Sequence, residues 1–199
     1  MIMKRKAIII STAAVSGALA VTLNLARGLT TFPFPVLTYL KIELAEIPIV
    51  AAYLISGPAA SMAAALIYWL ALNIFGEFVP LGPAMKLVAL ASTLAGIYVA
   101  RKVFPSTRYR LAADLACAAA LRTLTMTLIN YLILIWLFPE WLGYAEQLLR
   151  VAGLTGAAPS LVIIIALTAV YNTIHAAISL SLAYTITKSI SSLHTTRSQ

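Results

Sequence analysis

The sequence predicts an all-α integral membrane protein, folded as a single domain of six transmembrane helices over residues 1–199. Apolar residues make up 62% of the chain, charged residues make up 10%, and the mean hydropathy is +0.96, values far outside those of soluble domains. The apolar runs are about 20 residues long, which suits a helix that crosses a bilayer, and they lack the alternation of a membrane β-barrel. Such spans use nearly the whole chain, so we expect no separate soluble domain.

Charged, proline-containing or glycine-containing segments separate the predicted spans. The spans are residues 7–26, 47–55, 59–75, 84–100, 111–137 and 158–188. The first span begins like a secretory signal, but its apolar run continues past a possible cleavage site at Ala18-x-Ala20, so we expect the segment to be retained. We expect loops at 30–40, where two prolines exclude a helix, and at 139–159, and a polar, frayed tail at 189–199.

The distribution of charge predicts the orientation of these spans. With the N-terminus inside, the inner side holds Lys4, Arg5, Lys6, Arg101, Lys102, Arg108, Arg110, Lys188 and Arg197. Almost all acidic residues fall on the outer side. This pattern follows the positive-inside rule, so both termini are predicted to be cytoplasmic. The net charge of +8 therefore reflects orientation, and we expect no nucleic acid partner.

Charged residues also lie close to the second span. Lys41, Glu43 and Glu46 precede it or enter it, and we expect them at its water-facing mouth. Pro48 fits the first turn of this span, where its missing N–H costs nothing. Gly57-Pro58 predicts a tight turn into the third span.

The fifth span carries Asp114, Arg122 and Asn130 at intervals of eight residues. Each is rotated by about 80° from the one before, so they do not form one stripe on a helix. We expect Arg122 to pair with Asp114 in a structural ion pair.

The last span carries a polar stripe. Thr168, Asn172, His175 and Ser179 follow one another at the spacing that places residues on one face of a helix. Polar groups inside a bilayer cost free energy unless they find partners, so the stripe indicates a functional site. Hydrogen bonds between packed helices would explain the same residues equally well.

Small residues recur at four-residue spacing in the first span. The pairs are Ala13 with Gly17, Ala14 with Ala18, and Ser16 with Ala20. Such spacing lets another helix approach closely, although an alanine-rich helix also produces it by chance.

Together these motifs resemble those of a known family. Tyr39 to Pro48 followed by Gly57-Pro58 resembles the loop-and-second-helix signature of the substrate-binding S components of energy-coupling factor (ECF) vitamin transporters. Asn130-Tyr131 and Asn172-x-x-His175 are similar to the riboflavin-type members. The resemblance implies capture of a vitamin from outside, in a pocket built by spans 4 to 6 and capped by the loop after span 1.

The resemblance also implies which residues act. The expected ligand-binding residues are Asn130, Asn172, His175, Thr168, Tyr131, Lys86, Tyr39 and Glu43. The expected contact with a transmembrane coupling subunit, itself driven by two cytoplasmic ATPases, consists of Ala13, Ala14, Gly17 and Ala18. No cofactor or metal is expected, because the bound vitamin is the transported ligand.

The sequence departs from the family pattern at several positions. His175 stands where relatives carry Lys, and Lys86 and Ala89 stand where they carry an acidic residue and Asn. Tyr68-Trp69 replaces a Lys-Asn pair. Riboflavin is therefore the first choice of ligand, with another vitamin-sized solute such as pantothenate close behind.

Other classes of function receive less support. A membrane enzyme would draw on Glu43, Glu46, Asp114, Arg122 and His175, but the chain has no H-E-x-x-H or G-x-S-x-G motif. It also lacks a phosphate-binding G-x-x-x-x-G-K-[S/T] loop, and its single cysteine, Cys117, excludes a disulfide framework. A structural subunit would require neighbouring helices to fill the polar stripe. A channel would require rings of charge that the sequence does not suggest.

Overall fold

The computed structural model describes residues 2–156 and 158–197, which form helices and one two-stranded sheet. In chain order the elements are α1 (Ile2–Leu25), α2 (Arg27–Thr30), β1 (Thr31–Pro33), β2 (Lys41–Glu43), α3 (Glu46–Ser56), α4 (Pro58–Phe75), α5 (Leu81–Val103), α6 (Arg110–Leu132), the π-helix η1 (Ile133–Leu137), α7 (Pro139–Val151) and α8 (Ser160–Arg197).

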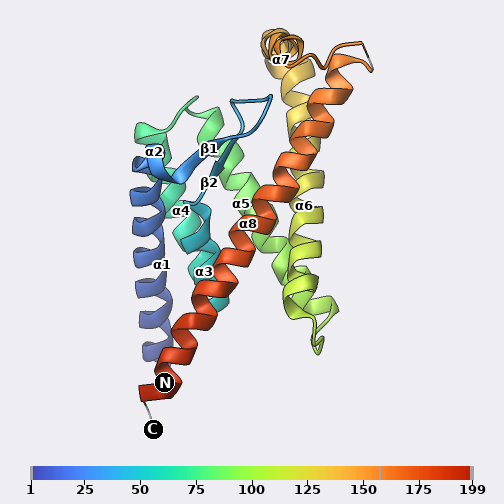
Figure 1. Ribbon diagram of the computed structural model, residues 1–199. Helices are drawn as coiled ribbons and strands as arrows, with labels where there is room; N and C mark the ends of the chain where they lie inside the picture. The colour runs from blue at the N-terminus through green and yellow to red at the C-terminus, as the bar shows by residue number, and fades with distance from the viewer. Residues whose placement is uncertain (1, 157, 198–199) are drawn as a thin grey trace.

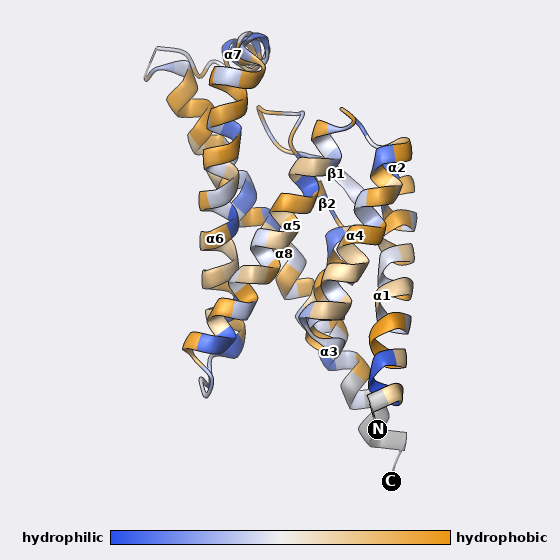
Figure 2. Ribbon diagram, turned by 180° about the vertical axis from the view of Figure 1, so that it is seen from behind, coloured by the Kyte–Doolittle hydropathy of each residue, from blue (hydrophilic) through white to orange (hydrophobic). Residues whose placement is uncertain are grey.

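The long helices form two packed groups (Figure 1). Helices α1, α3 and α4 contact one another, α6 packs against both α5 and α8, and contacts of α3 with α8 and of α4 with α5 join the groups. Within the described residues, five helices are long and apolar enough to cross a membrane, and the shorter apolar α3 occupies the position of the predicted span 47–55. Apolar residues predominate along these helices (Figure 2), and many large apolar side chains are exposed, as expected of a multi-pass membrane protein.

The predicted turn between the second and third spans is confirmed. Gly57 has a φ of 87°, a left-handed conformation that L side chains rarely adopt, and Pro58 starts α4. Across this turn the Ser61 hydroxyl donates a hydrogen bond to the Ile49 carbonyl at 2.7 Å, which holds α4 against α3.

The proline-rich segment after α1 forms a β-hairpin. Strands β1 and β2 pair antiparallel, with Thr31 opposite Glu43. The tip of the hairpin is tied down by Leu37, which is fully buried in an apolar cluster with residues of α7 and α8. Tyr171 on α8 donates a hydrogen bond from its hydroxyl to the Lys41 carbonyl at 2.7 Å. The hairpin is thus attached to the opposite helix group.

The prediction of a loop at 139–159 is wrong over most of its length, because α7 occupies Pro139–Val151. Proline at the first position starts the helix without loss of a hydrogen bond. Ala145 and Leu149, four residues apart, bury one face of α7, while Gly143 and Gln147 remain exposed. Helix α7 lies across the ends of α6 and α8 (Figure 1).

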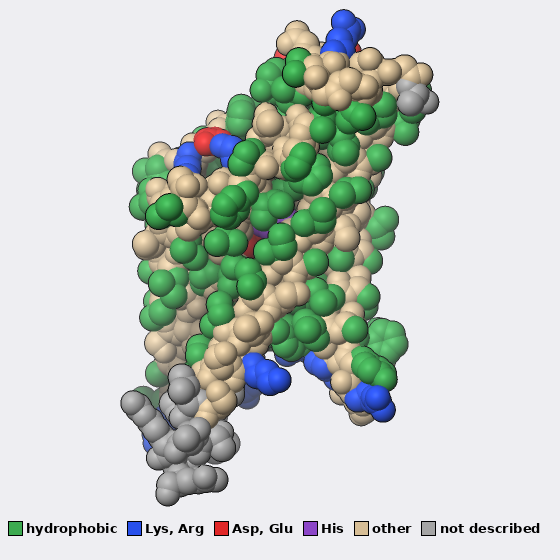
Figure 3. Space-filling view, viewed as in Figure 1, with side chains coloured by type: hydrophobic (Ala, Val, Ile, Leu, Met, Phe, Trp, Pro, Cys, Tyr) green, Lys and Arg blue, Asp and Glu red, His purple; other side chains and the backbone are tan. Residues whose placement is uncertain are grey.

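The opposite end of the molecule is basic. The start of α1, the turn between α5 and α6 and the end of α8 all lie there (Figure 1), and lysine and arginine side chains gather at this end (Figure 3). Helix α8 continues to Arg197, so it includes most of the tail predicted at 189–199; Ser198 and Gln199 lie outside the described residues. This arrangement agrees with the predicted cytoplasmic position of both termini.

Candidate ligand-binding site

A cavity of about 490 Å³ opens between the two helix groups, at the end that carries the hairpin and α7. Its polar lining consists of Asn24, Arg27, Tyr39, Lys41, Glu43, Glu46, Glu77, Lys86, Arg122, Asn130, Tyr144, Tyr171, Asn172 and His175. Its volume lies within the range of small-molecule sites, about 300–1,000 Å³.

The floor of the cavity contains a buried ion pair between α3 and α6. Arg122 donates from both terminal nitrogens to the Glu46 carboxylate, at 2.5 and 3.1 Å, in the forked geometry that suits these two groups. Its Nε donates to the Asn172 amide oxygen at 3.2 Å. Arg122 and Glu46 are only 2% and 3% exposed. These contacts connect three helices at the base of the cavity.

The expected pairing of Arg122 with Asp114 is therefore wrong. Asp114 is fully buried nearer the basic end, where Tyr184 donates to its carboxylate at 2.5 Å and Arg101 at 3.3 Å. Two positions eight residues apart on a helix differ by about 12 Å in height as well as by rotation. The two side chains consequently meet different neighbours.

His175 lies beside this pair. Its Nδ1 is 3.1 Å from Arg122 Nη2 and 3.1 Å from the Tyr171 hydroxyl. Its Nε2 is 3.2 Å from the Glu43 backbone carbonyl. His175 thus links the floor of the cavity to strand β2.

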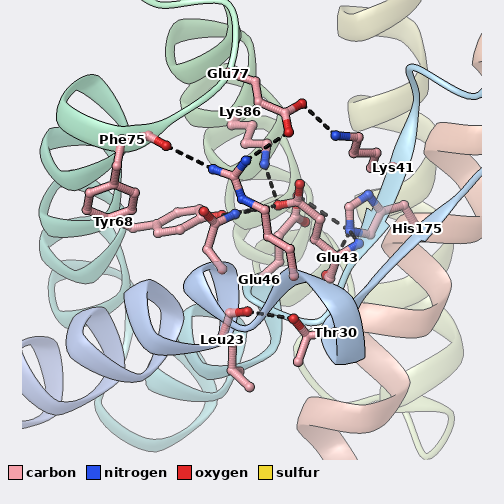
Figure 4. Close-up of polar contacts among 12 residues, drawn as sticks. Leu23, Thr30, Lys41, Glu43, Glu46, Tyr68, Phe75, Glu77, Lys86 and His175 are labelled. Atoms are coloured by element: carbon pink, nitrogen blue, oxygen red, sulfur yellow. Dashed lines mark hydrogen bonds and ion pairs between the residues drawn. The ribbon is translucent and has the colours of Figure 1, made fainter.

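A second polar cluster centres on Glu43 (Figure 4). Lys86 on α5 forms an ion pair with its carboxylate, and the Tyr68 hydroxyl and the Asn24 amide each donate to it at 3.2 Å. Asn24 also donates to the Tyr68 oxygen at 3.0 Å. The cluster joins α1, α4 and α5 to the hairpin.

The expected position of Glu43 and Glu46 at a water-facing mouth is also wrong. Both are buried, at 6% and 3% exposure, because each carboxylate has a cationic partner inside the fold. Lys41, the third residue of that group, does lie at the mouth, where it donates to Glu77 at 2.5 Å.

Glu77 connects the loops around the mouth. It accepts hydrogen bonds from Lys41 on the hairpin, at 2.5 Å, and from Arg27 on α2, at 2.8 Å. The hydrogen bond from Lys41 lowers the pKa of the Glu77 carboxyl, and the nearby charges of Lys41 and Arg27 act in the same direction. Burial raises the pKa of Tyr39, also at this end, to about 12, so its phenol stays protonated.

Aromatic side chains form much of the wall near α7. Trp141 stacks on Phe138 with ring centroids 4.6 Å apart and meets Phe78 edge-on at 5.6 Å. Tyr39 and Tyr144 face each other at 6.3 Å. The cavity therefore combines a charged but internally paired floor with aromatic walls.

The structure brings most of the expected ligand-binding residues together. Asn130, Asn172, His175, Lys86, Tyr39 and Glu43 all line the cavity. Thr168 is buried but does not line it, and its hydroxyl donates to the Ile164 carbonyl of its own helix at 2.9 Å. Tyr131 is 44% exposed and also lies outside the lining.

Several lining residues were not expected to bind ligand. Arg122 and Glu46 were expected elsewhere, although a charged residue inside an apolar span is itself a signal of function. Asn24, a lone amide near the end of an apolar helix, carried the same signal. Tyr171 and Trp141 carried none, because aromatic residues are common in membrane helices and at their ends. Within residues 2–156 and 158–197 no group of His, Cys, Asp and Glu side chains could hold a metal ion.

The four small residues expected to contact a coupling subunit divide into two faces of α1. Ala13 and Gly17 are buried within the chain, and a Cβ atom on Gly17 would lie 2.9 Å from Ile67 of α4. Ala14 and Ala18 are exposed. The first pair thus explains why α1 and α4 pack closely, and only the second pair is free to meet another protein.

These features define a class: a multi-pass helical membrane protein with a polar cavity at the end that carries the hairpin and α7. No family model matches the sequence, and no curated protein matches it. Among solved structures, the chain is similar to the S component of a bacterial ECF transporter, with a TM-score of 0.73, 22% identity, and coverage of 97% of this chain and 98% of the other. The chain therefore has the fold of an ECF S component, as the sequence motifs predicted.

Proposed function

We propose that this chain is the substrate-binding subunit, or S component, of an ECF-type transporter in the cell membrane, and that its ligand is a vitamin, with riboflavin first. The observation that carries the proposal is the cavity of about 490 Å³ lined by Asn130, Asn172 and His175, within a fold shared with an S component over almost its whole length. A solute-capturing subunit needs such a cavity, whereas a purely structural subunit does not.

The chemistry of the cavity supports a ligand with little net charge and a flat ring. The two cations at its base, Lys86 and Arg122, are already paired with carboxylates. A carboxylate ligand such as pantothenate would have to compete with those partners. The aromatic walls offer faces and edges to a ring, and amides can match its donors and acceptors. These features favour riboflavin over pantothenate.

Transport itself would depend on other subunits. The sequence has no phosphate-binding loop, so the energy would come from two cytoplasmic ATPases through a transmembrane coupling subunit. The exposed Ala14 and Ala18 of α1 are the proposed contact with that subunit, since small side chains let two membrane helices approach closely.

Calorimetric titration of riboflavin into the purified protein tests the ligand and its site together. Asn172→Ala removes an amide from the cavity and one hydrogen-bond partner of Arg122, so we expect binding at least tenfold weaker, about 1.4 kcal/mol. The matched control is Asn73→Ala. Both asparagines donate to the carbonyl four residues earlier in their own helix, Asn172 at 2.9 Å and Asn73 at 2.8 Å. Asn73, however, lies outside the cavity lining.

The control variant should bind riboflavin as the unmodified protein does. Equal affinity of the Asn172→Ala variant and the unmodified protein would remove Asn172 from the site. If pantothenate gives binding heat and riboflavin gives none, the cavity is assigned to pantothenate.

A further inference from the structure

A second cavity lies at the basic end of the molecule, and the proposed function does not use it. It has a volume of about 680 Å³ and is lined by Leu54, Arg101, Pro105, Arg110, Tyr184, Thr187 and Lys188. The lining residues come from the last turn of α3, the end of α5 and the turn after it, the start of α6, and residues 184–188 of α8. The cavity is therefore a hollow near the predicted cytoplasmic face.

Positive charge exceeds negative charge at this cavity. Of its three cations, Arg101 has an acidic partner, the buried Asp114 at 3.3 Å. Arg110 donates from Nη2 to the Pro105 carbonyl at 2.6 Å, while its Nη1 is buried and, among the described residues, has no hydrogen-bond partner. Lys188 is exposed and, within the described parts of the chain, has no ion pair. The site thus offers two cations to an anion from outside the chain.

Exposed apolar side chains occur near these cations in the chain. Val103 at the end of α5 and Phe104 and Tyr109 in the turn after it are exposed. Ile186 and Ile190, each two residues from Lys188, are exposed on the other side of α8. A free anion in water would use only the cations. A molecule with an anionic head and apolar chains would use both groups, and cations at the end of membrane helices are placed to meet such heads.

We propose that this cavity binds the phosphate headgroup of an anionic membrane lipid in the inner leaflet. The exposed Lys188 ammonium contacts the phosphate oxygens, and the Arg110 guanidinium adds a second positive charge beside them. The acyl chains lie along the exposed Phe104, which precedes the lining residue Pro105. The lipid would hold the ends of α6 and α8 together at the membrane surface.

Native mass spectrometry of the full-length protein, released from detergent micelles with added lipid, tests this site. The probes are dioleoyl-phosphatidylglycerol, which is anionic, and dioleoyl-phosphatidylcholine, which has no net charge. We expect the protein to retain the anionic lipid preferentially. The Arg110→Gln/Lys188→Gln variant should retain it at least fivefold less, because two cations are lost from the cavity.

The control is Lys102→Gln/Arg108→Gln, which removes the same charge from the same end but from outside the cavity lining. Its retention should fall less than twofold. An equal loss in both variants would show diffuse attraction and overturn the site, and so would equal retention of the two lipids. Displacement of the anionic lipid by millimolar inorganic phosphate would assign the cavity to a free anion.

A further outcome concerns protein partners. If the Arg110→Gln/Lys188→Gln variant keeps its lipid but no longer assembles with the coupling subunit and ATPases, the cavity belongs to a protein contact and the lipid proposal is wrong. Riboflavin titration and thermal unfolding of the same variant keep the two proposals separate. If riboflavin binding and the unfolding midpoint of this variant are unchanged, its loss of lipid reports on the second cavity alone.

Discussion

At the residue scale, the buried charges determine how the cavity is built. Arg122 and Glu46 lie in the membrane-embedded interior, where an unpaired charge is very costly. Removal of one partner from such a pair costs about 3–5 kcal/mol, whereas joint replacement by apolar residues of similar volume is often neutral. The ion pair therefore stabilises the arrangement of α3 and α6 at the floor of the cavity only while both residues are present.

We predict that Glu46→Gln strongly destabilises the protein, by about 3–5 kcal/mol, because it leaves Arg122 buried without a counter-charge. Thermal unfolding of the purified protein in detergent measures the effect. The double variant Glu46→Leu/Arg122→Met should unfold at a higher temperature than Glu46→Gln alone. The exposed Glu140→Gln serves as a control and should leave the midpoint unchanged. A midpoint for Glu46→Gln equal to that of the control would show that the ion pair with Arg122 does not stabilise the fold.

The sequence predicted which residues meet at the site better than it predicted their pairings. The spacing of Thr168, Asn172, His175 and Ser179 placed them on one face of α8, and all four are buried. The partner of Arg122 could not be predicted this way, because Glu46 is distant in the chain and reaches it only through the packing of α3 against α6 and α8. Pairings between helices depend on tertiary contacts that no helical period encodes.

At the element scale, three segments meet at the mouth of the cavity. The hairpin, α2 and the loop between α4 and α5 are joined through Glu77, which accepts from Lys41 and Arg27. None of these segments spans the membrane. The contacts of Glu77 with Lys41 and Arg27 connect them directly. Loss of these contacts would loosen the mouth of the cavity, through which a ligand would leave.

We predict that acid weakens this connection. The hydrogen bond from Lys41 holds the pKa of Glu77 below its ordinary value of 4.5, so the folded state favours the charged form. Its contribution is fully present above that ordinary value and is lost as the pH falls through the lower folded value. Stopped-flow measurement of riboflavin release should show faster release in this acidic range.

The variant Glu77→Gln should show the faster release already at pH 7, with no further change on acidification from this group. The increase should not exceed about fivefold, since partly exposed ion pairs contribute little. Glu140→Gln at the same end is the matched control and should behave as the unmodified protein does. A Glu77→Gln variant with unchanged release at pH 7 would show that the connection does not restrain the ligand.

Helix α7 shows where prediction of elements failed. The segment 139–159 combines proline, glycine and charged residues, which favoured a loop. A proline at the first position is compatible with a helix, however, and the burial of Leu149 against the hairpin cluster stabilises it. The long spans were predictable because the bilayer fixes their length and composition, whereas α7 depends on a tertiary contact.

At the scale of the whole molecule, the ligand and the coupling subunit would meet different parts of the chain. The cavity lies between the two helix groups, and the exposed small residues of α1 lie on the outside of one group. Binding and transport should therefore respond separately to substitution.

We predict that Ala14→Phe and Ala18→Phe abolish uptake by the complete transporter but leave riboflavin binding by the isolated subunit unchanged, because a bulky side chain there keeps a partner helix at a distance. Vitamin uptake by cells and calorimetry measure the two effects. Ala166→Phe, at an exposed alanine of α8, is the control and should spare both. Full uptake with either α1 variant would contradict this contact.

Native mass spectrometry of the gently purified protein, together with its visible absorption spectrum, tests the proposed vitamin site most directly. We expect one small molecule bound to each chain, with the mass and the yellow absorption of a flavin. A chain that carries no small molecule and gives no binding heat with riboflavin or pantothenate would contradict the proposal, whatever the similarity of its fold.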